Sequence, residues 1–144
     1  MPDSGASPIF EHEIRVGWGD CDPAKIAYTG RLPEFALRAI DAWWEDTLGG
    51  DGWYQLEMDR GFGTPFVNLS MDFRSPVTPR HRLKCEVRPT RLGNKSISFR
   101  VLGRQDGVLC FEGNFTCVFT QAGTVQTRPA PPDIRAIVEP LIRR

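Results

Sequence analysis

Apolar and polar residues alternate over residues 9–18, and the period then changes over residues 31–48. The first pattern is typical of a half-buried strand. In the second segment, apolar residues recur every three or four positions, as on the buried face of an amphipathic helix. These residues are Leu32, Phe35, Ala36, Ala39, Ile40, Trp43, Trp44 and Leu48. Because this apolar face is wide, we expect the helix to lie at the centre of the core.

Strands dominate the rest of the chain. Asp51 is expected to cap a short helix over residues 52–60. Period-two alternation then covers residues 67–74, 83–88, 96–101 and 109–119. Short connections, including the hairpin signal Asp106-Gly107, predict an antiparallel meander of four strands. A short helix is predicted near the C-terminus, around residues 134–141.

The predicted order is one strand, one long helix, one short helix and four strands, which is an α+β fold. The helix at 31–48 is the only large apolar element that can cover the sheet, so we expect the sheet to curl round it. Such a sheet leaves edges to be covered, which favours a homodimer or homotetramer. The 144 residues are expected to form a single domain, with residues 1–8 as a flexible tail.

Composition disfavours several classes of protein. The hydrophobic content of 40% and the charged content of 25% are typical of a soluble globular domain. No apolar run approaches the roughly 20 residues of a membrane span, and residues 1–7 do not resemble a signal peptide. We therefore expect a cytoplasmic protein without a membrane partner. The four cysteines lack the spacing of a zinc site, and no metal is expected.

Charge is unevenly distributed along a chain that is neutral overall. Residues 1–72 hold 13 acidic and 5 basic residues, for a balance of −8, whereas residues 73–104 hold 1 acidic and 9 basic residues, for +8. The basic stretch is either the solvated face of exposed strands or a site for a polyanion such as a phosphorylated cofactor. Zero net charge and few interleaved aromatic residues disfavour a nucleic-acid partner.

The most informative motif is Gly19-Asp20-Cys21-Asp22-Pro23-Ala24, between the first strand and the long helix. Proline fixes its own φ and biases Asp22 away from helical geometry, so the turn is rigid. A rigid turn between two ordered elements can aim a carboxylate into a cleft. In the simplest alternative, Asp20 or Asp22 only caps the turn or the next helix.

This motif resembles the 4-hydroxybenzoyl-CoA thioesterase branch of the hot-dog superfamily. Less specific matches are Gly63-Thr64-Pro65, Lys95-Ser96 and the proline-rich segment after Arg128. The resemblance covers roughly residues 10–132 and implies a hot-dog fold, with an antiparallel sheet wrapped round one long helix. It also implies hydrolysis of a small aryl or aliphatic acyl-CoA, in which coenzyme A is part of the substrate and no separate cofactor is needed.

The resemblance also implies roles for individual residues. Asp22 matches the catalytic carboxylate, which acts as nucleophile or general base. The amide that polarises the thioester carbonyl falls at Thr29, with Tyr28 just before it. Leu37 stands where the hydroxybenzoyl enzyme has an acid that binds the phenol hydroxyl. A leucine cannot make that hydrogen bond, so an aliphatic or unsubstituted aryl acyl group is expected.

The basic stretch is expected to bind the phosphates of coenzyme A across a dimer interface. Arg91 and Lys95, beside the turn Gly93-Asn94, are the first candidates, and Arg88 and Arg128 are further ones. An alternative to the enzyme is a hot-dog protein that binds acyl-CoA without hydrolysing it. A hot-dog dehydratase is disfavoured, because neither His12 nor His81 follows the acidic turn.

Overall fold

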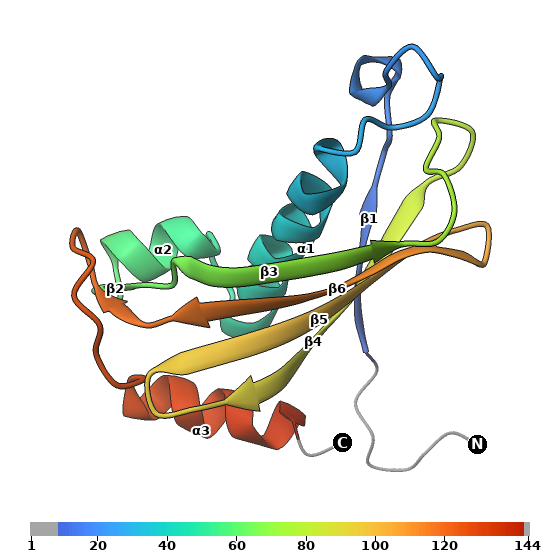
Figure 1. Ribbon diagram of the computed structural model, residues 1–144. Coiled ribbons are helices and arrows are strands. Elements are labelled where there is room, and N and C mark those ends of the chain that lie inside the picture. The colour runs from blue at the N-terminus through green and yellow to red at the C-terminus, as the bar shows by residue number, and fades with distance from the viewer. Residues whose placement is uncertain (1–8, 143–144) are drawn as a thin grey trace, which may run out of the picture.

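A five-stranded antiparallel sheet curls round helix α1 (Arg31–Leu48) in the computed structural model, which describes residues 9–142 (Figure 1). The strands lie in the order β1 (Phe10–Ile14), β4 (Leu83–Leu92), β5 (Ser96–Gln105), β6 (Val108–Val118) and β3 (Phe66–Phe73). This is the hot-dog fold, and it confirms the expected α+β class. The expected tail, residues 1–8, lies outside the described residues.

Helix α1 forms the centre of the core. Its side chains Phe35, Ala36, Ala39, Ile40 and Trp44 are fully buried. Alanines let the helix approach the sheet, and Trp43 and Trp44 pack edge-on against Phe99 of β5, with ring centroids 5.0 and 6.2 Å apart. The helix ends at Gly49, whose φ of 67° is a left-handed conformation that glycine adopts without strain. The predicted helix at 31–48 is therefore confirmed.

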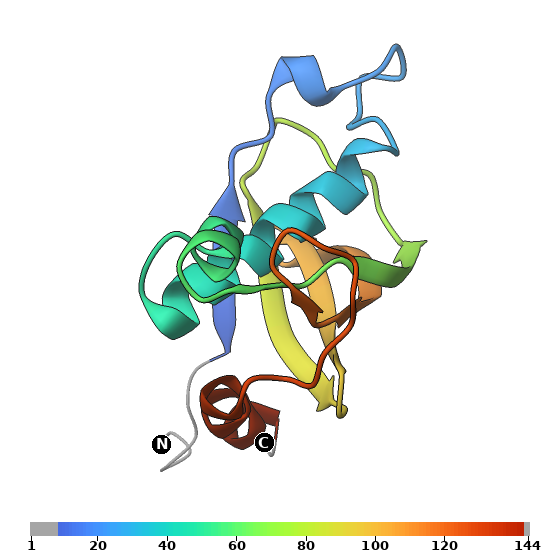
Figure 2. The same ribbon diagram turned by 90° about the vertical axis from the view of Figure 1, so that its left-hand side faces the viewer.

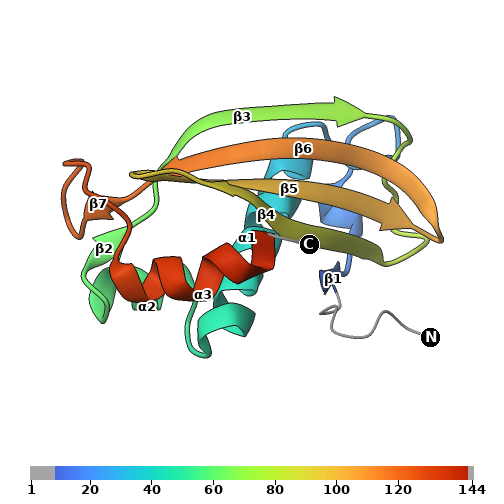
Figure 3. The same ribbon diagram turned by 90° about the horizontal axis from the view of Figure 1, so that it is seen from below.

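The smaller elements lie around the ends of the sheet. A short 3-10 helix, η1 (Trp18–Asp20), follows β1, and β2 (Phe62–Gly63) pairs with β7 (Thr120–Gln121). Helices α2 (Trp53–Met58) and α3 (Pro132–Ile142) lie on the same side of the sheet as α1 (Figure 3). The predicted cap of α2 was wrong, because the Trp53 N–H donates to Asp41 Oδ1 at 2.8 Å and not to Asp51.

The predicted meander of four strands was wrong in one respect. Strands β4, β5 and β6 are sequential neighbours, but β3 pairs with β6 and the other side of β4 pairs with β1. The connection over residues 74–82 therefore runs from β3, at one edge of the sheet, to β4, which lies next to β1 at the opposite edge. Alternation shows which face of a strand is buried, and it does not identify the neighbouring strand.

The two edge strands present different surfaces. Val67, Leu69 and Phe73 of β3 are 60%, 42% and 51% exposed. Strand β1, at the other edge, exposes Glu11 and Glu13, and charged side chains protect an edge from pairing with another strand. The alternation over residues 67–74 predicts that Val67, Leu69 and Phe73 are buried on one face of the sheet. Within one chain these side chains remain exposed, so β3 is an edge strand with exposed apolar side chains.

Candidate active site

The acidic turn is part of a small hairpin between β1 and α1. Asp22 N–H donates to the Ile26 carbonyl at 3.0 Å, and Cys21 forms a β-bridge with Ala27. Ala27 N–H donates in turn to the Val77 carbonyl at 2.7 Å, which ties the hairpin to the connection before β4. These bonds fix the turn at the N-terminal end of α1, at the top of the molecule (Figures 1 and 2).

The two acids of the turn have different partners. Asp20 Oδ2 accepts a hydrogen bond from Gly17 N–H at 2.9 Å, and its Oδ1 lies 3.5 Å from Arg31 Nε. The half-buried Asp22 accepts only from Ala24 N–H, at 2.8 Å on Oδ1, and no cation of residues 9–142 lies within 4.0 Å of it. Both carboxylate oxygens of Asp20 therefore have partners within the loop and α1, whereas Asp22 Oδ2 remains available to another partner.

Unused backbone donors lie at the start of α1. Among the described residues, no acceptor takes the N–H of Thr29 or of Gly30, and Pro33 in the first turn has no N–H. Donors at a helix N-terminus favour negative charge and can stabilise a developing oxyanion. The Tyr28 N–H is not among them, because it donates to the Asp20 carbonyl at 2.8 Å. Any contribution of Tyr28 to the site would come from its exposed ring.

Leu37 lines an apolar pocket further along α1. The pocket has a volume of about 260 Å³ and lies between α1, α2 and the start of β3. It is lined by Leu37, Trp53, Leu56, Glu57, Gly63, Thr64 and Phe66. Leu37 is eight positions after Thr29, so the pocket lies about 12 Å along the helix axis from the free amides.

Sequence reasoning missed most of this pocket. Trp53 and Phe66 lie on α2 and β3, and their rings pack edge-on with centroids 5.8 Å apart. Their spacing in the chain carries no signal for such a contact. Thr64 belongs to the segment Gly63-Thr64-Pro65, one of the less specific family matches, and that match was the only indication that this segment belongs to the site.

The candidate phosphate-binding residues lie at the opposite end of the sheet. Arg91 and Lys95 flank the β4–β5 turn at the bottom of Figures 1 and 2, whereas the acidic turn is at the top. Phe119 N–H donates to the Lys95 carbonyl and Arg128 N–H to the Phe119 carbonyl, at 2.9 and 2.8 Å, so Arg128 lies beside Lys95. Strand β4 alone has 10 residues and spans about 30 Å. Asp22 and these cations are therefore not brought together within one chain.

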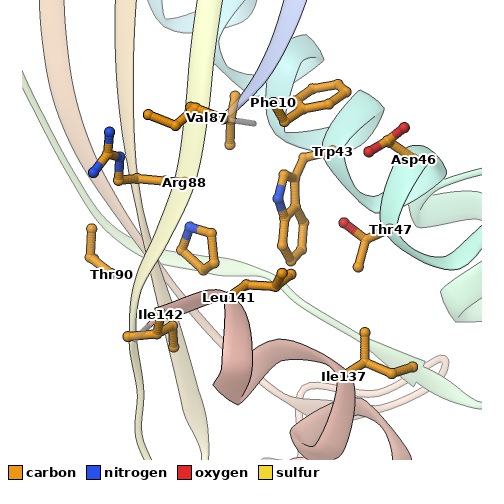
Figure 4. Close-up of a pocket in the computed structure, with 12 residues that line it drawn as sticks. Phe10, Trp43, Asp46, Thr47, Val87, Arg88, Thr90, Ile137, Leu141 and Ile142 are labelled. Atoms are coloured by element: carbon orange, nitrogen blue, oxygen red, sulfur yellow. The ribbon is translucent and has the colours of Figure 1, made fainter. Parts of the chain in front are cut away.

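Arg88 belongs neither to the acidic turn nor to the cations of the β4–β5 turn. It is at the rim of a larger pocket of about 580 Å³, between the C-terminal half of α1, β4 and α3 (Figure 4). Trp43 and Leu141 contribute to the walls, and the Arg88 guanidinium points away from Trp43 and lies 3.4 Å from Glu86. This pocket is larger than the Leu37 pocket, but it contains neither the acidic turn nor the free amides.

Several cations of the basic stretch are paired on the outer face of the sheet. Glu112 of β6 binds Arg74 and Arg100, and Glu86 of β4 lies within 3.4 Å of Arg88 and 3.3 Å of Arg104. Much of the positive charge of the basic stretch is therefore paired with carboxylates of the sheet itself. Within residues 9–142, Arg91 and Lys95 have no carboxylate within 4.0 Å.

The Glu112 pairs predict a pH-dependent stability. The hydrogen bond from Arg74, with the charges of Arg74 and Arg100, lowers the pKa of Glu112. A carboxyl whose pKa falls on folding stabilises the folded protein at pH values above its unfolded pKa of about 4.3. This stabilisation is lost as the pH falls through the lower pKa of the folded state. We expect Glu112→Gln to lower the urea midpoint at pH 7 and to match the wild type near pH 3. The control is Glu13→Gln, because Glu13 is exposed and pairs with no cation of residues 9–142 within 4.0 Å. An equal loss at both pH values would contradict the electrostatic origin.

The cysteines are distributed as the alternation predicts. Cys85, Cys110 and Cys117 are buried in the sheet, and burial raises the pKa of Cys85 and of Cys117 to about 12, so both remain neutral thiols at pH 7. Cys21 is half-buried. Within the described part of the chain, no three His, Cys, Asp or Glu side chains form a group that could hold a metal ion. No helix in that part is long and apolar enough to cross a membrane.

Comparison with known proteins gives a family and several structural neighbours. The model of the thioesterase-like superfamily matches residues 16–138. The chain is 64% identical to a thioesterase superfamily protein from Jannaschia sp. CCS1, with a TM-score of 0.92 over 99% of this chain and 96% of that one. No curated protein sequence matches the chain.

Two more distant structures resemble it in fold. A hypothetical protein from Thermus thermophilus is 23% identical, with a TM-score of 0.82 over 91% of this chain and 98% of that one. A 1,4-dihydroxy-2-naphthoyl-CoA thioesterase from Synechocystis is 20% identical, with a TM-score of 0.78 over 92% and 97%. The family match spans the acidic turn, α1 and every strand of the sheet except β1, and the chain therefore belongs to the thioesterase-like superfamily.

Proposed function

We propose that this protein is an acyl-CoA thioesterase that hydrolyses a small aryl or aliphatic acyl-CoA to the free acid and coenzyme A, as the 4-hydroxybenzoyl-CoA thioesterase branch does with its own substrate. The observation that carries the proposal is the pairing of two features in one hairpin. A carboxylate without a cationic partner, Asp22, precedes a helix start at which the N–H groups of Thr29 and Gly30 have no acceptor among residues 9–142.

The chemistry follows from these two features. The thioester carbonyl accepts hydrogen bonds from the free amides, which stabilise its oxygen as negative charge develops. As general base, Asp22 takes a proton from water while the hydroxide adds to the carbonyl carbon. The C–S bond then breaks, and the thiolate of coenzyme A receives the proton. As nucleophile, Asp22 adds to the carbonyl itself and the C–S bond breaks, which releases the coenzyme A thiolate and leaves a mixed anhydride on Asp22. Water then cleaves the anhydride, which releases the free acid and restores the Asp22 carboxylate, and the thiolate takes up a proton from this water.

The proposed catalytic unit is a homodimer in which one copy supplies Asp22 and the other binds the phosphates. Within one chain, the acidic turn and the β4–β5 turn lie at opposite ends of β4, which spans about 30 Å. Arg91 and Lys95 are exposed, and no carboxylate of the described residues pairs with them. A second copy that brings its own β4–β5 turn toward Asp22 would supply the missing cations.

Alanine at Arg91 or Lys95 is expected to raise KM for acyl-CoA about tenfold and to leave kcat nearly unchanged. The phosphates are remote from the reacting carbonyl, so their contacts contribute equally to substrate and transition state. Lys84→Ala is the matched control, because Lys84 is an exposed cation at the other end of β4. Steady-state kinetics with an acyl-pantetheine, which lacks the nucleotide phosphates, should show no effect. Equal losses on both substrates would exclude phosphate binding.

A panel of aryl, short-chain and long-chain acyl-CoA thioesters, followed with a thiol-detecting reagent, tests the proposed reaction and finds its acyl class. Cys21 is the cysteine that is not buried, so a blank with enzyme alone is required. Thiol release at a rate proportional to enzyme concentration is expected for at least one class. If no thioester is hydrolysed, the proposed activity is wrong.

A second candidate function is acyl-CoA binding without hydrolysis. The hydrogen bond from Ala24 N–H to Asp22 Oδ1 favours it, because this contact alone would explain an aspartate at the turn. A binding protein would be stabilised against unfolding by acyl-CoA and would return the thioester intact.

A further inference from the structure

The pocket between α1, β4 and α3 lies away from the candidate active site. Its volume of about 580 Å³ is within the range of pockets that bind small molecules. Trp43, on its wall, is 14 positions after Thr29, so the pocket lies about 20 Å along the helix axis from the free amides. It shares no lining residue with the Leu37 pocket. The proposed hydrolysis therefore does not use this pocket.

The pocket forms where β4 extends beyond its partner β1. Among residues 9–142, β1 pairs with β4 only as far as Phe10, opposite Val87, whereas β4 continues to Leu92. Helix α3 packs against β4, and its last turns form one wall of the pocket (Figure 4). This helix is tied to the β4–β5 turn by Arg135, which donates to the Gly93 carbonyl at 2.7 Å. The fold itself thus keeps the pocket in place.

An unused hydrogen-bond donor lies on the otherwise apolar wall. Trp43 is only 3% exposed, and its indole N–H has no acceptor among residues 9–142. The indole nitrogens of Trp44 and Trp53 also lack a partner, but they are enclosed in the protein, and that of Trp43 is not. In Figure 4 the Trp43 nitrogen lies on the side of the ring that faces β4, across the pocket. A ligand oxygen in the pocket could supply the missing acceptor.

The charged side chains of the pocket limit the charge of a ligand. Asp46 is exposed at the rim, and no cation of residues 9–142 lies within 4.0 Å of its carboxylate. Arg88 lies 3.4 Å from Glu86 and points away from Trp43. An anion would therefore meet an unpaired carboxylate and no free cation. An ammonium group cannot accept a hydrogen bond, so it would leave the Trp43 N–H unpaired. A neutral acceptor satisfies both conditions.

We propose that this pocket is a second ligand site, which binds a small, neutral and mainly apolar molecule through a carbonyl oxygen that accepts from the Trp43 indole N–H. The apolar walls bury the body of the molecule, and the indole fixes the position of its oxygen. They are formed by Phe10, Val87, Ile137, Leu141 and Ile142. The inference does not depend on the proposed thioesterase activity, because the pocket contains neither the acidic turn nor the free amides.

The test uses three probes of similar shape that differ in one group, namely acetophenone, ethylbenzene and benzoate. Each is titrated into the ¹⁵N-labelled protein, and the indole N–H resonances of the tryptophans are followed by NMR. Acetophenone should move the Trp43 proton resonance downfield, as formation of a hydrogen bond requires, and ethylbenzene should not. Benzoate should bind about tenfold or more weakly than acetophenone. A shift at Trp53 without one at Trp43 would place the probe in the Leu37 pocket and overturn the proposal.

Trp43→Phe removes the N–H and keeps an aromatic ring on the wall. It should raise the Kd of acetophenone about fivefold and leave that of ethylbenzene nearly unchanged. Trp44→Phe is the matched control, because the neighbouring indole N–H also lacks a partner but does not line the pocket. This variant should bind both probes as the wild type does. Equal changes for the two probes in Trp43→Phe would mean that the ring only packs against them, which would contradict the proposed hydrogen bond.

A fourth probe, 1-phenylethylammonium, tests the proposed neutrality of the ligand. It should bind more weakly than acetophenone, and Asp46→Asn should leave the Kd of acetophenone nearly unchanged. Tighter binding of the ammonium probe, lost in Asp46→Asn, would identify Asp46 and not Trp43 as the recognising group. That result would overturn the proposal even if both tryptophan variants failed to fold, because it is measured against the wild type.

Discussion

Replacing Asp22 by asparagine is expected to lower kcat about a hundredfold or more and to leave the fold intact. The asparagine side-chain oxygen can still accept the hydrogen bond from Ala24 N–H, which Asp22 Oδ1 accepts at 2.8 Å, so the turn should keep its shape. An amide can neither attack the thioester nor take a proton from water. Steady-state thiol release on the best substrate of the panel gives kcat, and circular dichroism checks the fold.

Asp20→Asn is the matched control, because it changes a neighbouring acid in the same turn. Asp20 holds Gly17 N–H and pairs with Arg31, so this variant should lose stability more than turnover. If Asp20→Asn abolishes hydrolysis and Asp22→Asn keeps it, the catalytic acid has been assigned to the wrong residue.

Lysine at Leu69 is expected to convert the proposed homodimer to a monomer and to remove most of the proposed activity. Leu69 is 42% exposed on edge strand β3, beside the exposed Val67 and Phe73. An unpaired apolar edge is a template for a second strand, and lysine is the residue that most often protects such an edge. Loss of the second copy would also remove the proposed phosphate-binding cations. Sedimentation velocity and the kinetic assay measure the two effects.

Val125→Lys controls for the charge itself. Val125 is 88% exposed and lies in the loop after β7, away from β3. This variant should remain a dimer with unchanged kcat. A Leu69→Lys protein that remains dimeric would show that β3 is not the interface, and a wild type that is monomeric at assay concentration would show that one chain suffices.

The elements of the fold could be predicted because their signals are local. The three-four spacing between Leu32 and Leu48 corresponds to α1, and the alternating segments correspond to strands. The order of the strands could not be predicted, because the pairing of Phe66 with Cys117 of β6 joins residues far apart in the chain. The exposure of β3 was missed for a related reason. Alternation indicates an apolar face, and it does not indicate whether the same chain covers that face.

The candidate site was predictable where it is formed by one segment. Asp22, Tyr28 and Thr29 lie in one hairpin and the helix start that follows it, and the structure adds that the Tyr28 amide is already occupied. The pocket round Leu37 was not predictable beyond Leu37 itself, because Trp53 and Thr64 reach it from other elements.

If the acidic turn hydrolyses a bound thioester, the wild type and Asp22→Asn must differ in what they do to the same bound ligand. The best ligand is mixed in excess with the wild type and with Asp22→Asn, and free acid and intact thioester are quantified by chromatography over time. We expect both proteins to bind the thioester and only the wild type to convert it to acid and coenzyme A over many turnovers. Full recovery of intact thioester from the wild type, with tight binding, would exclude hydrolysis at the acidic turn and would identify the chain as an acyl-CoA binding protein.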